Sequence, residues 1–223
     1  QSLIPSTLVG TRSRTHHSLK KRAKMSNDIY VFLDIETTGL DPKRDSILEI
    51  GWVMTNDRFE TLNTFSAAAV YSPMYEAQMG DYVKKMHEDS GLLADIRNNG
   101  YTSPLEPYAA REFERNISRH VNPDTNIFLA GFSVHFDKAF LSLESNWAGF
   151  FESKEDEPGL VHFNHRLLDL SAINLLACRV AGIPESRYKG ENDNPHRALN
   201  DCFEARDFAL NALKDFTTIK ENA

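Results

Sequence analysis

The chain has 223 residues, which is enough for one domain of ordinary to generous size but too few for two full-sized folds. Its composition, 41% hydrophobic and 26% charged with 11 glycines and 9 prolines, excludes collagen-like, low-complexity and wholly disordered proteins. No apolar run approaches the roughly 18 residues that a membrane-spanning helix needs, so we expect one core and no membrane partner. The net charge of −7 argues against a broad surface for long nucleic acids.

The first 27 residues differ from the rest of the chain in charge. They hold six basic residues and no acid, whereas the remainder has 19 basic and 32 acidic side chains, a net charge of −13. A basic, Ser/Thr-rich, acid-free segment is typical of a mitochondrial transit peptide with Met25 as a second start; a non-native extension and a nucleic-acid-binding arm are the alternatives. We expect residues 1–27 to be a tail, residues 28–223 to be the folded domain, and the protein to be cytoplasmic or mitochondrial.

Predicted strands and helices alternate after the tail. The predicted strands cover residues 28–34, 46–56, 64–70 and 126–134, and the predicted helices cover residues 104–121, 136–151, 170–182 and 195–216. The connection between the first two strands is so short that they should pair antiparallel. The alternation of strands with helices predicts an α/β fold, a mixed sheet covered by helices.

Acidic residues fall where predicted strands end, which is where catalytic groups gather in such sheets. Asp34 and Glu36 are two apart, so in extended backbone both carboxylates point to one face. This pair alone is a weak signal, because an Asp-x-Glu is expected about once by chance in such a chain. Asp137 ends a later strand, and Asp201 lies a turn and a half into the last predicted helix, behind His196. Four carboxylates from three separate elements predict an oxygen-rich site for two Mg²⁺ or Mn²⁺ ions about 3.5–4 Å apart.

These residues belong to stretches that occur in a fixed order: DIETTGL from Asp34 to Leu40, then Asp137, then HRALND from His196 to Asp201. The order and spacing resemble the three exonuclease motifs of the DEDD family, histidine subgroup. Within that family the chain is most similar to the oligoribonucleases, over nearly all of the sequence after the tail. Three further stretches carry this resemblance: MHEDSGLL from Met86, GFSVHFD from Gly131 and RLLDLS from Arg166.

The resemblance implies a ribonuclease H-like exonuclease domain over residues 28–223 and assigns roles to the acidic residues. Asp34, Glu36, Asp137 and Asp201 would be the metal ligands, and His196 the general base, since a near-neutral imidazole can take a proton from water. Two-metal-ion catalysis would then cut the terminal phosphodiester in the 3′→5′ direction and release a nucleoside 5′-monophosphate. Taken alone, His196 is better explained as a solvent-exposed helix start; Asp201 five residues on favours catalysis.

The same resemblance implies a set of substrate contacts. Leu40 would wedge between two bases, and Tyr82 would stack on one of them. A polar cluster would cap the 5′ phosphate, with Arg166 as a bidentate clamp. The predicted substrate-binding residues are Leu40, Tyr82, His87, Ser133, His165, Arg166 and Ser171. Such a cap excludes long RNA chains, which agrees with the net negative charge of the chain after residue 27. The alternatives are a packing role for Tyr82 and a surface ion pair for Arg166.

The chain also departs from the family pattern at four positions. Phe132 stands where the family has Asn, Thr37 where it usually has Met, and Asn200 where it has the Asp beside Asp201. His165 stands at a family Tyr that reaches the partner subunit's site. None of these positions is among the five catalytic residues, so the departures bear on the phosphate cap and on length preference.

The sequence therefore predicts a 3′→5′ exoribonuclease acting on short single-stranded RNA as a homodimer, with two Mg²⁺ or Mn²⁺ ions per site. One alternative is a broader DEDD exonuclease that trims longer RNA or DNA. Another is a catalytically idle RNA-binding or assembly subunit held by the basic tail. The complete set of catalytic residues argues against the idle subunit.

Overall fold

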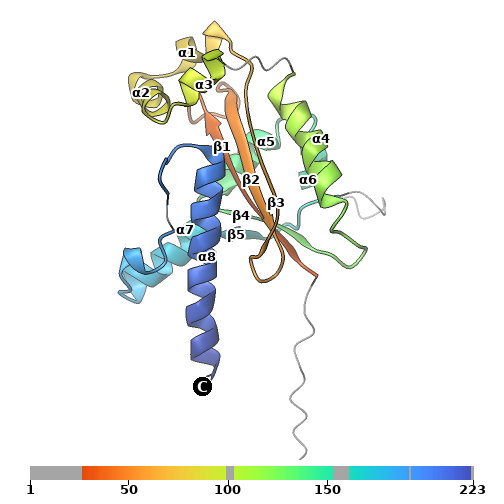
Figure 1. The fold of residues 1–223 in the computed structure, drawn as a ribbon, viewed down its shortest axis with the longest axis vertical. Helices are drawn as coiled ribbons and strands as arrows, with labels where there is room; N and C mark the ends of the chain where they lie inside the picture. Colours follow the sequence, from red (N-terminus) through yellow and green to blue (C-terminus); the bar gives the residue numbers. More distant parts are fainter. Residues whose placement is uncertain (1–26, 99–102, 153–160, 191, 222–223) are drawn as a thin grey trace, which may run out of the picture.

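The computed structural model describes residues 27–98, 103–152, 161–190 and 192–221, so the predicted tail lies, apart from its last residue, outside the described residues. Its centre is one sheet with the strand order β3-β2-β1-β4-β5 (Figure 1). The strands are β1 (Ile29–Thr37), β2 (Ile47–Thr55), β3 (Thr61–Ala68), β4 (Ile127–Gly131) and β5 (Leu167–Asp169). β1 pairs antiparallel with β2 and parallel with β4, which confirms the predicted mixed sheet.

Helices cover both faces of the sheet and one of its ends (Figure 1). They are α1 (Pro73–Gln78), α2 (Asp81–Asp89), α3 (Leu92–Asn98), α4 (Leu105–Ile117), α5 (His135–Leu141), α6 (Ala148–Phe151), α7 (Leu170–Leu175), the π-helical turn η1 (Leu176–Val180), the 3₁₀ turn η2 (Glu185–Arg187) and α8 (Ala198–Glu221). α8 packs along β1 and β2, α4 packs against β2 and β3, and α1 to α3 lie together beyond the ends of β1 and β2. In these described ranges, no helix is long and apolar enough to cross a bilayer.

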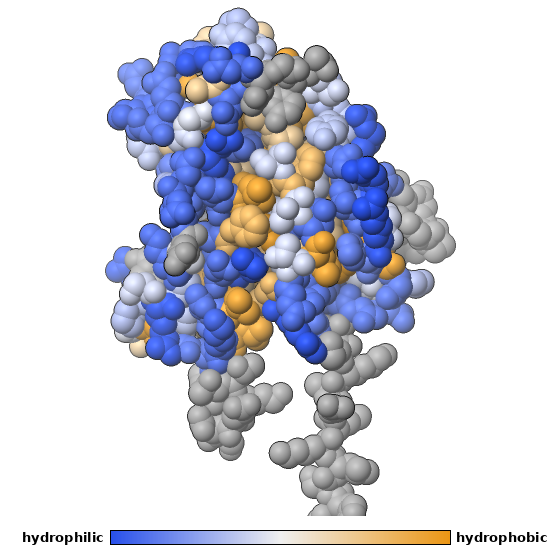
Figure 2. Space-filling model, viewed as in Figure 1, coloured by the Kyte–Doolittle hydropathy of each residue, from blue (hydrophilic) through white to orange (hydrophobic). Residues whose placement is uncertain are grey.

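The alternation of side chains in β1 divides the core in two. Val31, Leu33 and Ile35 pack with Phe113 of α4 on one face. Phe32 points to the other face and packs with residues of α8. Burying one such side chain stabilises the fold by roughly 1.5–3 kcal/mol. Because residues two apart share a face, the same alternation directs Asp34 and Glu36 toward α8. Figure 2 shows hydrophilic side chains over α8 and α4, with apolar and weakly polar residues between them over the strands.

Several predicted helices and strands have different bounds in the structure. The predicted helix over residues 136–151 is two short helices, because the chain turns between them to bury Trp147, whose Nε1–H donates to Glu106 O at 3.1 Å. The predicted strand over residues 126–134 ends at Gly131, since Ser133 has a positive φ of 49°. The predicted helix over residues 195–216 begins at Ala198, because His196 also has a positive φ, of 63°. The helices α1 to α3 and strand β5 were not predicted.

Candidate active site

Three elements bring Asp34, Glu36, Asp137 and Asp201, here called the carboxylate cluster, to one end of the sheet. β1 supplies Asp34 and Glu36 from successive positions on its α8 face. Asp137 lies in the first turn of α5 rather than at a strand end, and Asp201 lies in the first turn of α8 rather than a turn and a half into it. Asp137 Oδ1 accepts a hydrogen bond from the backbone N–H of Ile35 at 3.0 Å. This bond fixes α5 to β1 at the residue between the two acids of the strand.

The carboxylates of the cluster share a poorly solvated space and repel one another. Burial, followed by repulsion from Asp137 and Glu36, raises the pKa of Asp34 well above its usual range. Burial and the charge of Asp201 raise the pKa of Glu36 to about 8. Burial raises the pKa of Asp137 to about 8 as well, although the bond from Ile35 opposes this shift. Such a cluster is electrostatically unfavourable when fully ionised unless cations neutralise it.

The loop before α8 places His196 beside the cluster. Its backbone N–H donates to Asp201 Oδ2 at 3.1 Å, and the amide of Asn192 donates to Asp201 Oδ1 at 2.6 Å and to Glu204 Oε2 at 2.9 Å. Glu36, His196 and Asp201 each offer one ligand atom, and these atoms all lie within 4.8 Å of one another. The loop thus brings the histidine and one carboxylate of α8 together with a carboxylate of β1.

A buried glutamate in β2 holds the start of α8. Glu49 accepts the backbone N–H of Ala198 at 2.9 Å and pairs with Arg197 at 3.1 Å. The carboxylate thereby satisfies a backbone donor that the first turn of a helix leaves unpaired. Glu49 was not predicted; its signal was an acid inside the apolar run ILEIGWVMT. Its contacts fix the first turn of α8, which carries Asp201.

His87 lies beneath the active site rather than on its surface. It is fully buried, and its Nε2 is 2.9 Å from the carbonyl of Thr37, to which Nε2–H can donate. Its Nδ1 has no hydrogen-bond partner among the described residues and lies 3.8 Å from Glu36 Oε2. Burial lowers the pKa of His87, which favours the neutral ring. The geometry gives His87 a contact to the end of β1, and its role in substrate binding stays a prediction.

Two of the predicted substrate contacts project into solvent near the cluster. Leu40 is 81% exposed in the turn after β1, and Tyr82 is 79% exposed at the start of α2. A cavity of about 410 Å³ separates α2 from the His196 loop; it is lined by Tyr82, Lys85, Met86, Asp89, Ser90, Asn194, Pro195 and His196. We call it the Tyr82 cavity.

The predicted phosphate cap is assembled in part. Ser133 and Ser171 lie with their hydroxyl oxygens 3.1 Å apart, and the Ser133 N–H donates to Ser171 Oγ at 2.9 Å. Asp169 accepts the Ser171 N–H at the start of α7. Arg166 is exposed just before β5, and its own backbone N–H donates to Asn164. His165 lines a separate small cavity of about 180 Å³ with residues of α5 and α6.

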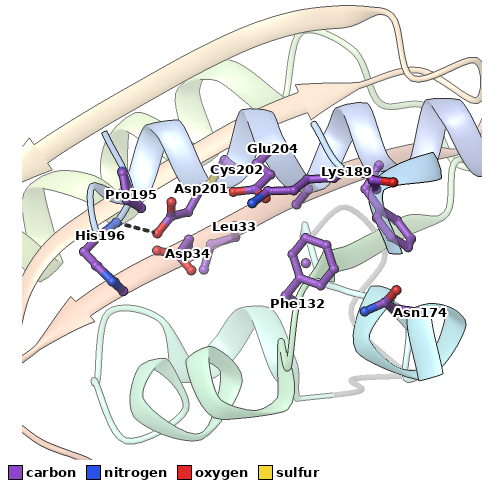
Figure 3. Close-up of a pocket in the computed structure, with 14 residues that line it drawn as sticks. Leu33, Asp34, Phe132, Asn174, Lys189, Pro195, His196, Asp201, Cys202 and Glu204 are labelled. Atoms are coloured by element: carbon purple, nitrogen blue, oxygen red, sulfur yellow. Dashed lines mark hydrogen bonds between the residues drawn. The ribbon is translucent and has the colours of Figure 1, made fainter. Parts of the chain in front are cut away.

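A cavity of about 690 Å³ extends from the cluster along α8 (Figure 3). Three predicted residues line it: Asp34, His196 and Asp201. Its other end is lined by Phe132, Asn174, Ser186 and Lys189, none of which was predicted to contact a substrate. We call this end the Phe132 arm. Pro195 and His196 line both this cavity and the Tyr82 cavity, so the His196 loop separates the two.

Comparison with known proteins agrees with this arrangement. The family model described as exonuclease matches residues 31–207. The oligoribonuclease of Corynebacterium glutamicum (strain R) is 34% identical over 182 residues, which cover 80% of this chain and 75% of that protein. The oligoribonuclease of Coxiella burnetii is 30% identical over 79% of this chain and 87% of that protein. The chain belongs to the oligoribonuclease family of exonucleases.

Solved structures with the same fold extend beyond the oligoribonuclease family. Exonuclease I of E. coli, in its complex with single-stranded DNA and zinc, aligns with a TM-score of 0.55 and 18% identity over 89% of this chain and 43% of that chain. Pop2p of S. pombe, in a form with Mg²⁺ and Mn²⁺ bound, aligns with a TM-score of 0.56 and 10% identity over 84% of both chains. At these identities the likeness shows the ribonuclease H-like exonuclease fold, which confirms the predicted fold class.

The donor set of this oligoribonuclease-family site suits divalent cations. It consists of carboxylate oxygens, with the imidazole of His196 beside them, and hard cations such as Mg²⁺ and Mn²⁺ prefer oxygen ligands. Burial raises the pKa values of Asp34, Glu36 and Asp137, and the positive charge of Arg197 opposes the shift of Glu36 only in part. Bound cations would supply further positive charge.

Proposed function

We propose that the chain is a 3′→5′ exoribonuclease that hydrolyses very short RNA, from dinucleotides upward, to nucleoside 5′-monophosphates. The observation that carries the proposal is the convergence of Asp34, Asp201 and His196 on one cavity, with Glu36 beside His196 and Asp201, in a member of the oligoribonuclease family. The net charge of −13 after the tail supports short substrates, because a long RNA would need many basic contacts.

The residues of the site divide the chemistry between them. Asp34, Glu36, Asp137 and Asp201 would hold two Mg²⁺ or Mn²⁺ ions, which would stabilise the negative charge that develops on the phosphate and the leaving oxygen. His196 would take a proton from the attacking water, whose oxygen forms the new bond to phosphorus. The bond from phosphorus to the 3′ oxygen breaks, so the terminal nucleotide leaves as a 5′-monophosphate. The leaving 3′ oxygen takes up a proton from solvent, so the shortened RNA keeps a 3′ hydroxyl for the next round.

The exposed residues around the cluster would select the length of the substrate. Leu40 and Tyr82 offer apolar and aromatic surface to the bases, and stacking on such a residue is worth roughly 1–3 kcal/mol per base. Ser133, Ser171 and Arg166 would cap the 5′ phosphate. The contact between Ser133 and Ser171 supports this cap, since it brings their hydroxyl oxygens within 3.1 Å of each other.

Timed digestion of 5′-labelled RNAs of two to ten nucleotides, with and without Mn²⁺, tests the proposal. We expect cleavage only with the metal and a rate that falls sharply between two and about seven nucleotides. A flat length profile would instead favour a broader exonuclease that trims longer RNA or DNA. Binding without cleavage at any length would favour an idle RNA-binding subunit.

We further propose that the enzyme is a homodimer. The observation in favour is a group of exposed aliphatic side chains, Leu175, Leu176 and Val180, within six consecutive residues of α7 and η1. Exposed aliphatic residues grouped in this way are typical of protein interfaces. Sedimentation should give a dimer mass for the wild type. It should give a monomer mass for Val180→Asp, because a dimer of this variant would bury an unpaired aspartate in its interface. A wild-type monomer at micromolar concentration would contradict the proposal.

A further inference from the structure

We infer that Phe132 is a second base-stacking platform, so that a dinucleotide places one base in the Tyr82 cavity and the other in the Phe132 arm. This inference rests on the proposed function and names a residue that determines its specificity. It concerns a position where this chain differs from the family pattern, and it gives an aromatic residue to each side of the catalytic centre.

The first support is the position of the Phe132 ring. It is 36% exposed and lines the same cavity as Asp34, His196 and Asp201. Figure 3 shows the ring projecting into the cavity between the cluster and Asn174. Buried Phe208 packs edge-on against it, with ring centroids 5.2 Å apart and an interplanar angle of 75°. One side of the ring is thus supported by the core, while other parts stay open to the cavity.

The second support is that the backbone on each side of Phe132 is fixed. A Cβ at Gly131 would approach the carbonyl of Leu33 to 3.0 Å, so glycine allows β4 to pass close to β1 there. Ser133 adopts a left-handed conformation and is tied through its N–H to Ser171. A ring held in this way loses little conformational freedom when a base stacks on it, which improves binding.

The third support is the arrangement of the two cavities around the catalytic histidine. The Tyr82 cavity and the cavity with the Phe132 arm both include Pro195 and His196 in their walls. A dinucleotide has one scissile phosphate between two nucleosides, so a phosphate near His196 places one base on each side. Lys189 lines the Phe132 arm and brings positive charge to a cavity whose other end is acidic. That charge favours the anionic sugar–phosphate chain of the nucleotide in this arm.

Steady-state kinetics of Phe132→Ala tests the inference in the full chain with Mn²⁺. For a 5′-phosphorylated RNA dinucleotide we expect KM to rise about 5- to 150-fold, the scale of one lost base stack, with kcat changed less than threefold. Phe132→Tyr keeps a ring and should restore wild-type KM. Phe216→Ala is the matched control, because Phe216 is an exposed phenylalanine of α8 that lines neither cavity; it should leave KM unchanged.

Dinucleotides that lack one base separate stacking from packing. Removing the base that occupies the Phe132 arm should raise the wild-type KM as Phe132→Ala does, and the two losses should not add, because each removes the same contact. The loss caused by removing the other base should add fully to the loss caused by Phe132→Ala. Full additivity for both abasic substrates, or a Phe132→Ala variant with lower kcat and unchanged KM, would overturn the inference.

Calorimetric binding of a noncleavable dinucleotide gives the same comparison without turnover. A wild type that prefers long RNA would refute the proposed short-RNA specificity alone. The affinity losses for Phe132→Ala and for each abasic ligand would still decide whether the ring stacks on a base.

Discussion

The carboxylate cluster and the exposed residues around it are built in different ways. Backbone hydrogen bonds from Ile35 and His196 hold Asp137 and Asp201, and two strands and two helices support the cluster. Leu40, Tyr82 and Arg166 are exposed, and their side chains make no hydrogen bond within the described ranges. The protein therefore fixes the cluster before a substrate arrives, whereas the exposed side chains would be ordered by the substrate that we propose they bind.

This difference leads to different expectations for substitutions. A change in the cluster should affect all substrates equally, because every scissile phosphate meets the same carboxylates. A change among the exposed residues should lower the cleavage rate only for substrates whose length brings them into contact with that residue. Length dependence of the loss is thus the measurement that separates the two regions.

Asp34→Ala should make turnover undetectable on RNA of every length. It removes a proposed metal ligand, so the remaining carboxylates would hold cations poorly. The fold should persist, since the change also relieves repulsion within the cluster; thermal melting checks this. Asp124→Ala, which changes an exposed acid in the turn before β4, is the control and should keep full activity. More than a tenth of wild-type activity in Asp34→Ala would contradict the role of Asp34.

The raised pKa values predict that the metal-free protein loses stability as pH rises. The pKa values of Glu36 and Asp137 are about 8 in the folded protein against ordinary values of 4.5 and 3.8, so the folded state binds more protons between these limits. The free energy of unfolding should therefore fall from about pH 5 to about pH 8. Melting curves in a chelator should show this fall, Mn²⁺ should reverse it, and Glu36→Gln should reduce its slope. A melting temperature independent of pH would contradict the prediction.

His196→Ala should lower kcat by about 10²–10⁴-fold, the usual contribution of a general base. Metal binding, measured by calorimetry, should persist, because the four carboxylates remain. The loss should be the same for a dinucleotide and a heptamer, because His196 would act at the scissile phosphate of every substrate. His120→Ala changes an exposed histidine after α4 and serves as the control. A pH–rate profile in His196→Ala identical to that of the wild type would exclude His196 as the base.

The sequence predicted the strand that carries Asp34 and Glu36 better than the helix that carries Tyr82, for a physical reason. Asp34 and Glu36 follow from the two-residue period of an apolar strand, which packing against α8 preserves. By contrast, α2 is short and mostly polar and buries only His87, so few apolar residues marked the helix and it was not predicted. β5 has three residues, which is too short for any pattern.

The rest of the site is formed by residues far apart in the sequence, so local patterns did not identify it. Phe132 and Lys189 line one cavity because Phe132 and Tyr188, the neighbour of Lys189, both pack against Phe208 of α8, and no local pattern contains these contacts. His87 was assigned from its neighbours in the chain, which do not reveal that its ring turns inward to Thr37. Burial of a polar ring depends on tertiary contacts, and these become visible only in the folded chain.

Arg166→Ala should cause the smallest loss, and only for short substrates. A guanidinium that clamps a 5′ phosphate contributes when that phosphate lies within one dinucleotide of the scissile bond. For a 5′-phosphorylated dinucleotide we expect a loss of about 2–4 kcal/mol in kcat/KM, the scale of a desolvated charge-assisted pair. A heptamer should be cut at nearly the wild-type rate.

Dephosphorylation of the dinucleotide provides the test of the contact itself. It should mimic Arg166→Ala, and the two losses should not add, because each removes the same pair. Arg111→Ala changes an exposed arginine of α4 and should have no effect on either substrate. If Arg166→Ala slowed dinucleotide and heptamer equally, Arg166 would behave like a residue of the carboxylate cluster. The broader exonuclease would then become the better explanation.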